Sequence, residues 1–268
     1  MASQPLIDKT LDIIEAVGAS GSASMPQIQQ CCGLSLTTTH RIVKSLVRRG
    51  FLMRSGRADF RLGGAIVALA RQASPRDILA AIARPHLLSL SKLVRCHVHL
   101  GVWEGGMVTY VVKQRFGKVR IHSAEGMQLE GYCSALGKIL LSSLAEDELE
   151  RYLADGAFVP LTSNTLVDPD EIRDAIDAVR IQGWSTDEEE MVVGLRCAAV
   201  PIRDRAGKIV AAISVSHAPA SPAPFDTAAL VARLHNTASA ISTQLFPPGL
   251  HQGWLSHPLT SARIDEAP

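Results

Sequence analysis

The chain has 268 residues, of which 47% are hydrophobic and 20% are charged, and its formal net charge is +1. This length suits two domains with separate cores, and no apolar run approaches the roughly 20 residues that a membrane span requires. The first residues, MASQPLIDKT, hold no basic stretch followed by an apolar one, so we expect no secretory signal and a cytoplasmic location. Five scattered cysteines without CxxC spacing favour reduced thiols over a disulfide framework or a zinc site.

The near-neutral total hides an uneven distribution of charge. Residues 1–75 hold nine Lys or Arg against four Asp or Glu, whereas the remainder holds eighteen against twenty-two. Between His40 and Arg61, seven basic residues accompany a single acid, Asp59. A small basic domain joined to a larger, mildly acidic one is typical of a nucleic-acid-binding end and a separate regulatory or catalytic end.

The basic end predicts three helices. Apolar residues at positions 7, 11, 14 and 17 indicate an amphipathic helix over residues 5–17, which GASGSAS then interrupts. A short helix is expected over 25–32, before Gly33, and a third begins near Ser35 or Thr37, either of which suits an N-cap. This order is that of a helix-turn-helix. The predicted buried side of the third helix is Ile42, Val43, Leu46 and Val47.

A basic hairpin follows the third helix. FLMRSGRADFRLG predicts strands over 51–54 and 59–62, which would form the wing of a winged helix. Hydroxyls and an imidazole in the first turns of the third helix suit contact with base edges, and the nearby cations suit phosphates. The alternative is a solvated helix face, but the three-helix order with a basic hairpin favours double-stranded DNA. The residues predicted to contact DNA are Thr38, Thr39, His40, Arg41, Lys44, Arg48, Arg54 and Arg57.

The predicted organisation has four parts. Residues 1–62 form the winged helix-turn-helix domain, residues 63–75 a linker helix, residues 76–248 a larger domain, and residues 249–268 a flexible tail. In the larger domain, alternating apolar residues predict strands and longer periodic segments predict helices, which together indicate an α+β fold. The predicted strands are 97–103, 107–112, 120–123, 195–202 and 209–215, and the predicted helices are 77–94, 135–144, 147–153, 168–182 and 226–245.

Over about residues 5–247 the chain resembles the IclR family of bacterial transcriptional regulators. The matching segments are LSLTTTHRIVKSLVRRGFL, ADFRLG, CHVHLGVWEGGMVTYV, YCSALGKILLS and GWSTDEEEMVVGLRCAAVPIRDRAGKIVAAISVS, of which the last is the most specific. Two departures accompany the match: Tyr132-Cys133-Ser134 stands where the family usually has His-Ala-Thr or His-Ala-Ser, and the recognition helix lacks the common Pro-Lys-Ser opening.

The resemblance implies a winged helix followed by an effector-binding domain with a GAF/PAS-like antiparallel sheet and packed helices. It also implies homodimers or homotetramers on operator DNA, and a small organic acid, aromatic or short-chain, as effector. The implied effector-binding residues are Ala135 and Leu136, through their backbone N–H groups, and the side chains of Asp187, Cys197, Ser214 and Ser216. From the residues themselves, N–H groups at a helix start favour an anion, and serines two apart on one strand share a face.

Three alternatives apply to the same residues. The larger domain could be an enzyme acting on a small carboxylate with Cys197 as nucleophile, but no motif places a histidine beside that thiol, so we expect no enzyme. His97 and His99 could ligate a metal, yet a strand or core role is the commoner one, and neither a metal nor a cofactor is expected. Finally, the chain could bind nucleic acid non-specifically while its larger half only oligomerises.

Overall fold

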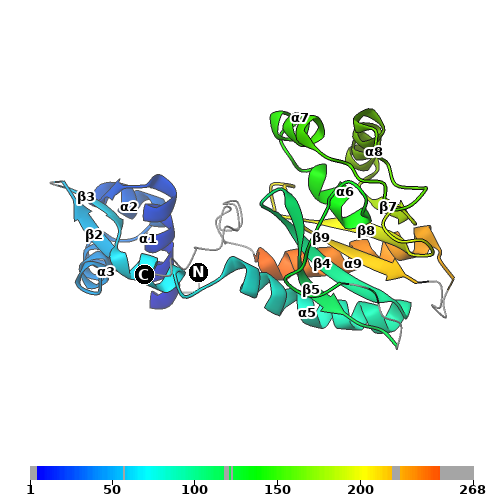
Figure 1. The fold of residues 1–268 in the computed structure, drawn as a ribbon. Helices are drawn as coiled ribbons and strands as arrows, with labels where there is room; N and C mark the ends of the chain where they lie inside the picture. Colours follow the sequence, from blue (N-terminus) through cyan, green and yellow to red (C-terminus); the bar gives the residue numbers. More distant parts are fainter. Residues whose placement is uncertain (1–4, 57, 118–120, 122, 219–223, 248–268) are drawn as a thin grey trace, which may run out of the picture. The chain divides into compact units, whose positions relative to one another are not determined.

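The computed structural model describes residues 5–56, 58–117, 121, 123–218 and 224–247, so Arg57 and the predicted tail at 249–268 lie outside the described residues. The contacts within the chain divide it into two compact units, residues 1–74 and residues 75–268 (Figure 1). Within the described part, no helix combines the length and the apolar character that crossing a bilayer demands.

The first unit is a winged helix-turn-helix. Ser24 caps the second helix through a capping box with Gln27, and Gly33 ends it in the left-handed conformation, so the turn before the third helix is tight. The three short strands form an antiparallel sheet in the order β1-β3-β2. Its elements are α1 (Leu6–Ser20), β1 (Ala23–Ser24), α2 (Met25–Cys32), α3 (Leu36–Arg48), β2 (Leu52–Ser55), β3 (Asp59–Leu62) and α4 (Gly64–Ala70).

The core of the first unit differs from the predicted stripe on α1. Ile13 and Val17 are fully buried, whereas Ile7 is 72% exposed and Leu11 is 51% exposed. Because residues four apart lie on the same side of a helix, the pair at 13 and 17 defines a packing side rotated away from positions 7 and 11. The apolar stripe predicted for α1 is therefore only partly a core stripe.

The second unit is built on one antiparallel sheet of six strands in the order β6-β5-β4-β9-β8-β7. The central strands β4 and β9 come from distant parts of the sequence and pair through His97↔Ser216 and His99↔Ser214. The elements of this unit are α5 (Pro75–Val94), β4 (His97–Glu104), β5 (Met107–Gln114), β6 (Gln128–Leu129), α6 (Ala135–Leu141), α7 (Glu146–Asp155), α8 (Pro169–Gln182), β7 (Ser185–Glu188), β8 (Arg196–Arg203), β9 (Ile209–His217) and α9 (Thr227–Leu245).

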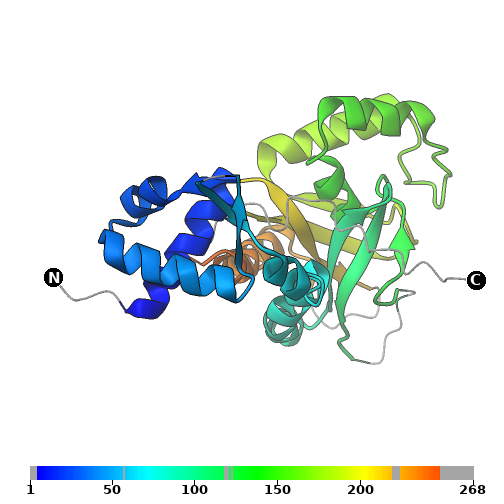
Figure 2. The ribbon, with the colours of Figure 1, turned by 90° about the vertical axis from the view of Figure 1, so that its left-hand side faces the viewer.

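The two faces of this sheet are covered by different helices. Helices α5 and α9 pack on one face, while α6 packs on the other, which we call the inner face, with α7 and α8 beyond it (Figures 1 and 2). The outer face contributes an apolar core that includes Val98, Leu100, Val200 and Ile213. The inner face also buries polar side chains. Because burying a polar group costs stability unless it is hydrogen-bonded, these side chains mark the inner face as a candidate functional site.

Three elements of the second unit differ from the predicted ones. The predicted strands include neither β7, which contains Asp187, nor the two-residue strand β6; both are short edge strands whose sequences lack an apolar alternation. The strand predicted over 120–123 falls partly outside the described residues, and Ile121 and Ser123 lie in irregular backbone. The predicted α+β architecture with an antiparallel sheet and packed helices is confirmed.

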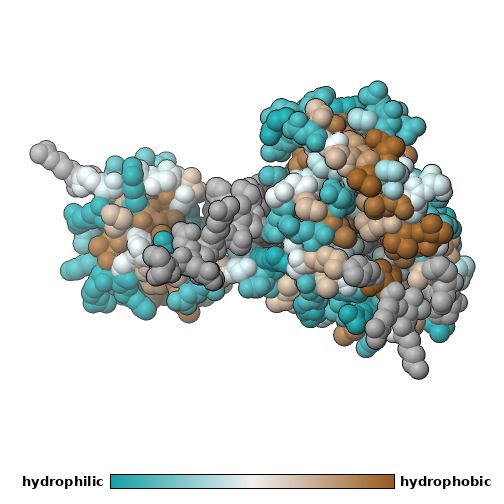
Figure 3. Space-filling model, viewed as in Figure 1, coloured by the Kyte–Doolittle hydropathy of each residue, from teal (hydrophilic) through white to brown (hydrophobic). Residues whose placement is uncertain are grey.

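Several apolar side chains stay exposed on the second unit, and Figure 3 shows hydrophobic patches in brown on its surface. Contiguous exposed apolar surface of this kind is typical of interaction sites between proteins. The most exposed are Ile181 at 88% and Val193 at 72%.

Candidate nucleic-acid interface and candidate ligand site

The start of α3 is fixed by Ser35. Its hydroxyl oxygen accepts a hydrogen bond from the Thr38 backbone N–H at 3.4 Å, and its own O–H donates to Thr38 Oγ1 at 2.9 Å. This cap satisfies one N–H group that the helix cannot pair by itself. Thr38 is half-buried by the arrangement, and it lies in the first turn of the helix, as the sequence predicts.

Thr39 corrects the predicted DNA-contacting set. The residue is fully buried, and its hydroxyl donates to the Ser35 carbonyl oxygen at 3.0 Å. Positions 39, 42, 43 and 46 recur at helical spacing, so Thr39 belongs to the side of α3 that packs on the core. The sequence predicts that hydroxyls in the first turns of this helix contact base edges, but the Thr39 hydroxyl is satisfied within the helix.

The basic side chains of α3 and the wing converge on one hollow. His40 and Lys44 of α3 and Arg54 of β2 line a cavity of about 290 Å³, and all three are exposed. The Arg54 guanidinium lies 5.8 Å from the centre of the Phe60 ring, which holds it against the wing. The structure thus brings together residues that are 14 positions apart in the sequence.

Arg41 and Arg48 occupy other parts of the same helix surface. Both are exposed, and Arg41 lines a separate groove of about 550 Å³ between α1 and α3. Among the described residues, no ion pair involves Arg41, Lys44, Arg48 or Arg54. Because their charge is not neutralised within the described part of the unit, these cations suit a polyanionic partner.

The predicted ligand-binding residues of the second unit lie in one layer, between the inner face of the sheet and α6. Asp187 of β7 pairs in register with Cys197 of β8, and Cys197 pairs with Ser216 of β9, so the three side chains share a face. Ser214 lies two residues before Ser216 on that face. All four are buried, with exposed fractions between 1% and 8%.

The start of α6 completes this layer. Ser134 caps the helix by accepting from the Gly137 N–H at 3.0 Å, which leaves the N–H groups of Ala135 and Leu136 as the first of the helix. Ala135 and Leu136 pack in the same apolar cluster as Cys197. A side chain at Gly137 would overlap the carbonyl oxygen of Gly131, so glycine is required for this close approach.

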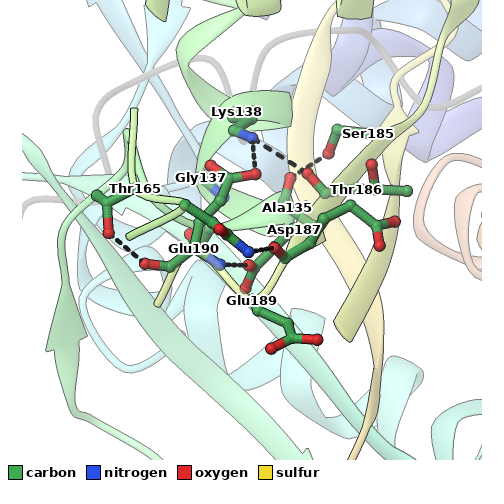
Figure 4. Close-up of polar contacts among 12 residues, drawn as sticks. Ala135, Gly137, Lys138, Thr165, Ser185, Thr186, Asp187, Glu189 and Glu190 are labelled. Carbon is green, nitrogen blue, oxygen red and sulfur yellow. Dashed lines mark hydrogen bonds and ion pairs between the residues drawn. The ribbon is translucent and has the colours of Figure 1, made fainter. Parts of the chain in front are cut away.

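A buried ion pair fastens α6 to the turn after β7 (Figure 4). Lys138 Nζ lies 2.5 Å from Glu190 Oε1, and it also donates to the Thr186 carbonyl oxygen at 3.2 Å. Ser185 adds a hydrogen bond from its hydroxyl to the Ala135 carbonyl oxygen. Lys138 and Glu190 are each 6% exposed, so the two charges depend on each other.

The Asp187 side chain on β7 is held by the turn that follows the strand. Its Oδ1 accepts from the Glu190 backbone N–H at 2.7 Å. Burial raises the pKa of the Asp187 carboxyl to about 6, and the hydrogen bond from the Glu190 backbone opposes this effect. The backbone of the turn after β7 therefore fixes the Asp187 carboxylate.

Cys197 and Ser216 continue into a polar network that the sequence did not predict. The Cys197 thiol lies 3.4 Å from Ser216 Oγ, and Ser216 Oγ lies 3.4 Å from His99 Nδ1. His99 Nε2 lies 3.1 Å from Ser123 Oγ, and the His99 ring stacks on Tyr110 at 4.8 Å. Burial raises the pKa of the Cys197 thiol well above its usual value, which opposes the reactive thiolate that a nucleophile needs.

Sequence reasoning missed His99, Tyr110, Lys138 and Glu190 as members of this layer. The alternation of His97 and His99 was visible, and both are buried on the sheet, in agreement with the core interpretation. Nothing in the sequence indicated that His99 faces Ser216, because their strands pair across more than a hundred residues. Within the described part of the chain, no three His, Cys, Asp or Glu side chains are grouped so as to hold a metal ion.

Comparison with known proteins covers both units. The model of the IclR helix-turn-helix domain matches residues 6–56, and that of the bacterial transcriptional regulator IclR C-terminal domain matches residues 71–243. The chain is 28% identical over 239 residues to the transcriptional regulator KdgR of Escherichia coli, covering 88% of this chain and 91% of KdgR. It is 32% identical over 237 residues to the repressor AllR of Salmonella paratyphi A, covering 85% and 84%. The crystal structure of Thermotoga maritima IclR superposes with a TM-score of 0.60 at 26% identity, covering 89% and 98%.

Proposed function

Since the chain belongs to the IclR family of bacterial transcriptional regulators, we propose that it binds operator DNA through its winged helix and a small organic acid through its C-terminal domain. The family comprises regulators rather than enzymes. The observation that carries the DNA half is the exposed basic surface of α3 and β2, which has no ion pair within the described residues. The acid changes the spacing of two winged helices in a homodimer, and thereby the affinity for a palindromic site.

The proposed DNA contacts come from two elements. Thr38, His40 and Arg41 lie in the first turns of α3 and are assigned to base edges, whereas Lys44, Arg48 and Arg54 are assigned to phosphates. Arg57 stays in the proposed set from the sequence alone. Thr39 is withdrawn because it is buried.

Binding of the full chain to its own upstream intergenic DNA tests this half. We expect a specific complex whose affinity falls steeply as salt rises, because each neutralised phosphate releases counterions. Lys44→Ala and Arg54→Ala should each weaken binding and lower the salt slope by about 1, whereas Lys92→Ala, which removes an exposed lysine of α5, should change neither. Equal affinity for unrelated DNA would instead favour the non-specific nucleic-acid hypothesis.

The proposed effector site is the layer between α6 and the inner face. The N–H groups of Ala135 and Leu136 would receive the carboxylate, and Asp187, Cys197, Ser214 and Ser216 would surround the rest of the molecule. An apolar cluster with a few buried polar groups is the composition that small-ligand sites share. We expect either an aromatic acid or a short-chain acid to fit.

A thermal-shift screen of carboxylic acids against the full chain tests this half. A bound acid raises the melting temperature, and the stabilisation grows with the logarithm of its concentration relative to Kd. Ser216→Ala should abolish the shift, whereas Ser143→Ala, just beyond the C-terminal end of α6, should not. Turnover of an added acid, lost in Cys197→Ser, would favour the enzyme alternative.

We further propose that the protein works in the cytoplasm as a homodimer or homotetramer. A twofold assembly matches the symmetry of a palindromic operator, and the exposed apolar side chains of the second unit offer surface for it. Light scattering at micromolar concentration, with and without operator DNA, gives the number of subunits directly.

A further inference from the structure

A line of hydrogen-bonded polar groups runs from the half-buried Lys113 across three strands of the inner face and ends in the proposed effector site. Lys113 of β5 donates from Nζ to Ser123 Oγ at 2.6 Å, Ser123 Oγ lies 3.1 Å from His99 Nε2, and His99 Nδ1 lies 3.4 Å from Ser216 Oγ. Ser123, His99 and Ser216 are 8%, 1% and 5% exposed. The bonds that His99 makes are buried, so their direction is set by the groups themselves, whereas Lys113 is half-buried.

At the Lys113 end of this line, the donor and the acceptor of the hydrogen bond are fixed. A lysine ammonium has three donors and no acceptor, and Lys113 Nζ uses them on the Ile121 carbonyl oxygen, the Ser123 carbonyl oxygen and Ser123 Oγ. Ser123 Oγ is therefore an acceptor toward Lys113. Its own O–H is then free to donate to His99 Nε2.

The His99 imidazole then determines which atom donates in the hydrogen bond to Ser216. Burial, together with Lys113 and His97, lowers the pKa of His99 to about 3, so the ring is neutral and has one donor and one acceptor. If Nε2 accepts from Ser123, the proton is on Nδ1, and Nδ1–H donates to Ser216 Oγ. Stacking on Tyr110 keeps the ring in the orientation that makes both contacts.

If the donors and acceptors of these hydrogen bonds were reversed, the buried Ser123 hydroxyl proton would have no acceptor. If Nε2–H donated to Ser123, then Ser123 Oγ would accept twice, and its O–H would need a further acceptor; among the described residues Ser123 Oγ has hydrogen-bond contacts only with His99 and Lys113. A buried O–H without an acceptor costs about 1–3 kcal/mol of stability. In the first direction Ser216 Oγ accepts, from Nδ1–H and from the Cys197 thiol at 3.4 Å, and the remaining O–H is that of Ser216, which lies at the proposed effector site where a ligand can supply its acceptor.

We propose that Lys113, Ser123 and His99 form a one-way donor chain that makes the Ser216 hydroxyl a hydrogen-bond donor to the effector. The effector atom at Ser216 is then an acceptor oxygen, from a carboxylate or a carbonyl group, and an ammonium or amidinium in that place is rejected. His99 is a positioning residue, since it acts on the ligand through Ser216. This inference rests on the effector-binding role proposed above.

The protonation of His99 is the direct test, and it needs no ligand. Long-range ¹H–¹⁵N spectra of the full chain with labelled histidine distinguish a protonated ring nitrogen from an unprotonated one, and the His99 signals are those missing from His99→Asn. We expect the proton on Nδ1. A proton on Nε2 in the wild-type protein would overturn the donor chain, whatever the variants do.

Matched variants supply the second readout. In His99→Asn the side-chain amide takes the place of Nδ1–H and keeps a donor toward Ser216, so binding of benzoate or acetate should be retained. His99→Leu and Lys113→Met remove the chain and should weaken that binding about tenfold. Lys92→Met, on the exposed side of α5, is the control. Equal loss in His99→Asn and His99→Leu, with unchanged melting temperatures, would contradict the chain.

Isosteric ligands test the charge that Ser216 selects. Benzoate and acetate accept hydrogen bonds, whereas benzamidine and acetamidine have the same shapes and donate them. We expect calorimetry to show binding of a carboxylate and none of its amidinium counterpart, and tighter binding of the amidinium would overturn the inference. If neither carboxylate nor any other acid binds, the proposed effector role fails, while the His99 tautomer still decides the donor chain.

Discussion

At the scale of single residues, the second unit depends on charges that lie out of water. Lys138 Nζ and Glu190 Oε1 are 2.5 Å apart and each residue is 6% exposed, and the pair connects α6 to the turn that follows β7, the strand of Asp187. A buried ion pair of this kind adds little net stability compared with apolar residues in the same place. Each charge, however, compensates the cost of burying the other. The pair therefore sets where α6 begins relative to the sheet.

Lys138→Met should destabilise the second unit by about 3–5 kcal/mol, because the Glu190 carboxylate would then be buried without its partner. Urea unfolding followed by far-UV circular dichroism measures the change. The double variant Lys138→Met/Glu190→Leu should recover most of that loss, since both charges are gone. A single variant as stable as the wild type would show that the pair is not buried in solution.

Asp187 gives the unit a defined pH dependence. Its pKa rises from 3.8 to about 6 on folding, so between these values the folded state binds more protons than the unfolded state. Its contribution to stability is therefore greatest below pH 4, declines as pH rises toward 6, and is constant above, with a total on the order of 3 kcal/mol. Asp187→Asn should remove this decline, and melting temperatures from pH 4 to pH 8 for both proteins would show it. Parallel curves would contradict the assignment.

At the scale of elements, one side of α3 packs on the core and the other carries the exposed basic residues. Thr39 and Val43 belong to the core side, while His40 and Lys44, one position further along, line the basic hollow. The helical period of 3.6 separates these sides by about 100° per residue. Adjacent residues of α3 should consequently respond differently to substitution.

Thr39→Val tests this division. The substitution keeps the side-chain volume and removes only a hydroxyl that bonds within the helix, so operator affinity should stay within about twofold. Lys44→Ala, five residues along, should lower the affinity about tenfold at physiological salt, because it removes a phosphate contact. Fluorescence anisotropy with labelled operator DNA measures both. Loss of binding in Thr39→Val with an unchanged melting temperature would place Thr39 back at the interface.

At the scale of the whole molecule, the proposed function links two sites on different units. If an acid changes operator affinity by some factor, operator DNA must change acid affinity by the same factor, since the coupling free energy is shared. For the usual 1–3 kcal/mol the factor is about 5–150. Calorimetric titration of the acid into free protein and into the operator complex gives one value, and anisotropy with and without acid gives the other. Unequal factors would show that the acid does not act through equilibrium binding.

The amino-acid sequence alone determined the family, the α+β class and the order of elements in the winged helix. These follow from features that neighbours in the chain carry: caps such as Ser35, stops such as Gly33, apolar periods and the uneven distribution of charge. The membership of the IclR family and the winged-helix character of the first unit are confirmed. The roles of the predicted DNA-contacting and effector-binding residues stay predictions.

Only the tertiary structure decided which polar groups meet. That Thr39 is buried depends on how α3 packs on α1 and α2, and that Asp187 sits on an edge strand depends on pairing with β8. The partnership of His99 with Ser216 arises because β4 pairs with β9, strands separated by more than a hundred residues. Interactions between residues close in the sequence determine where each helix and strand forms. Which polar side chains meet on the sheet depends on pairing between strands that are distant in the sequence, and the periodicity of apolar residues contains no information on that pairing.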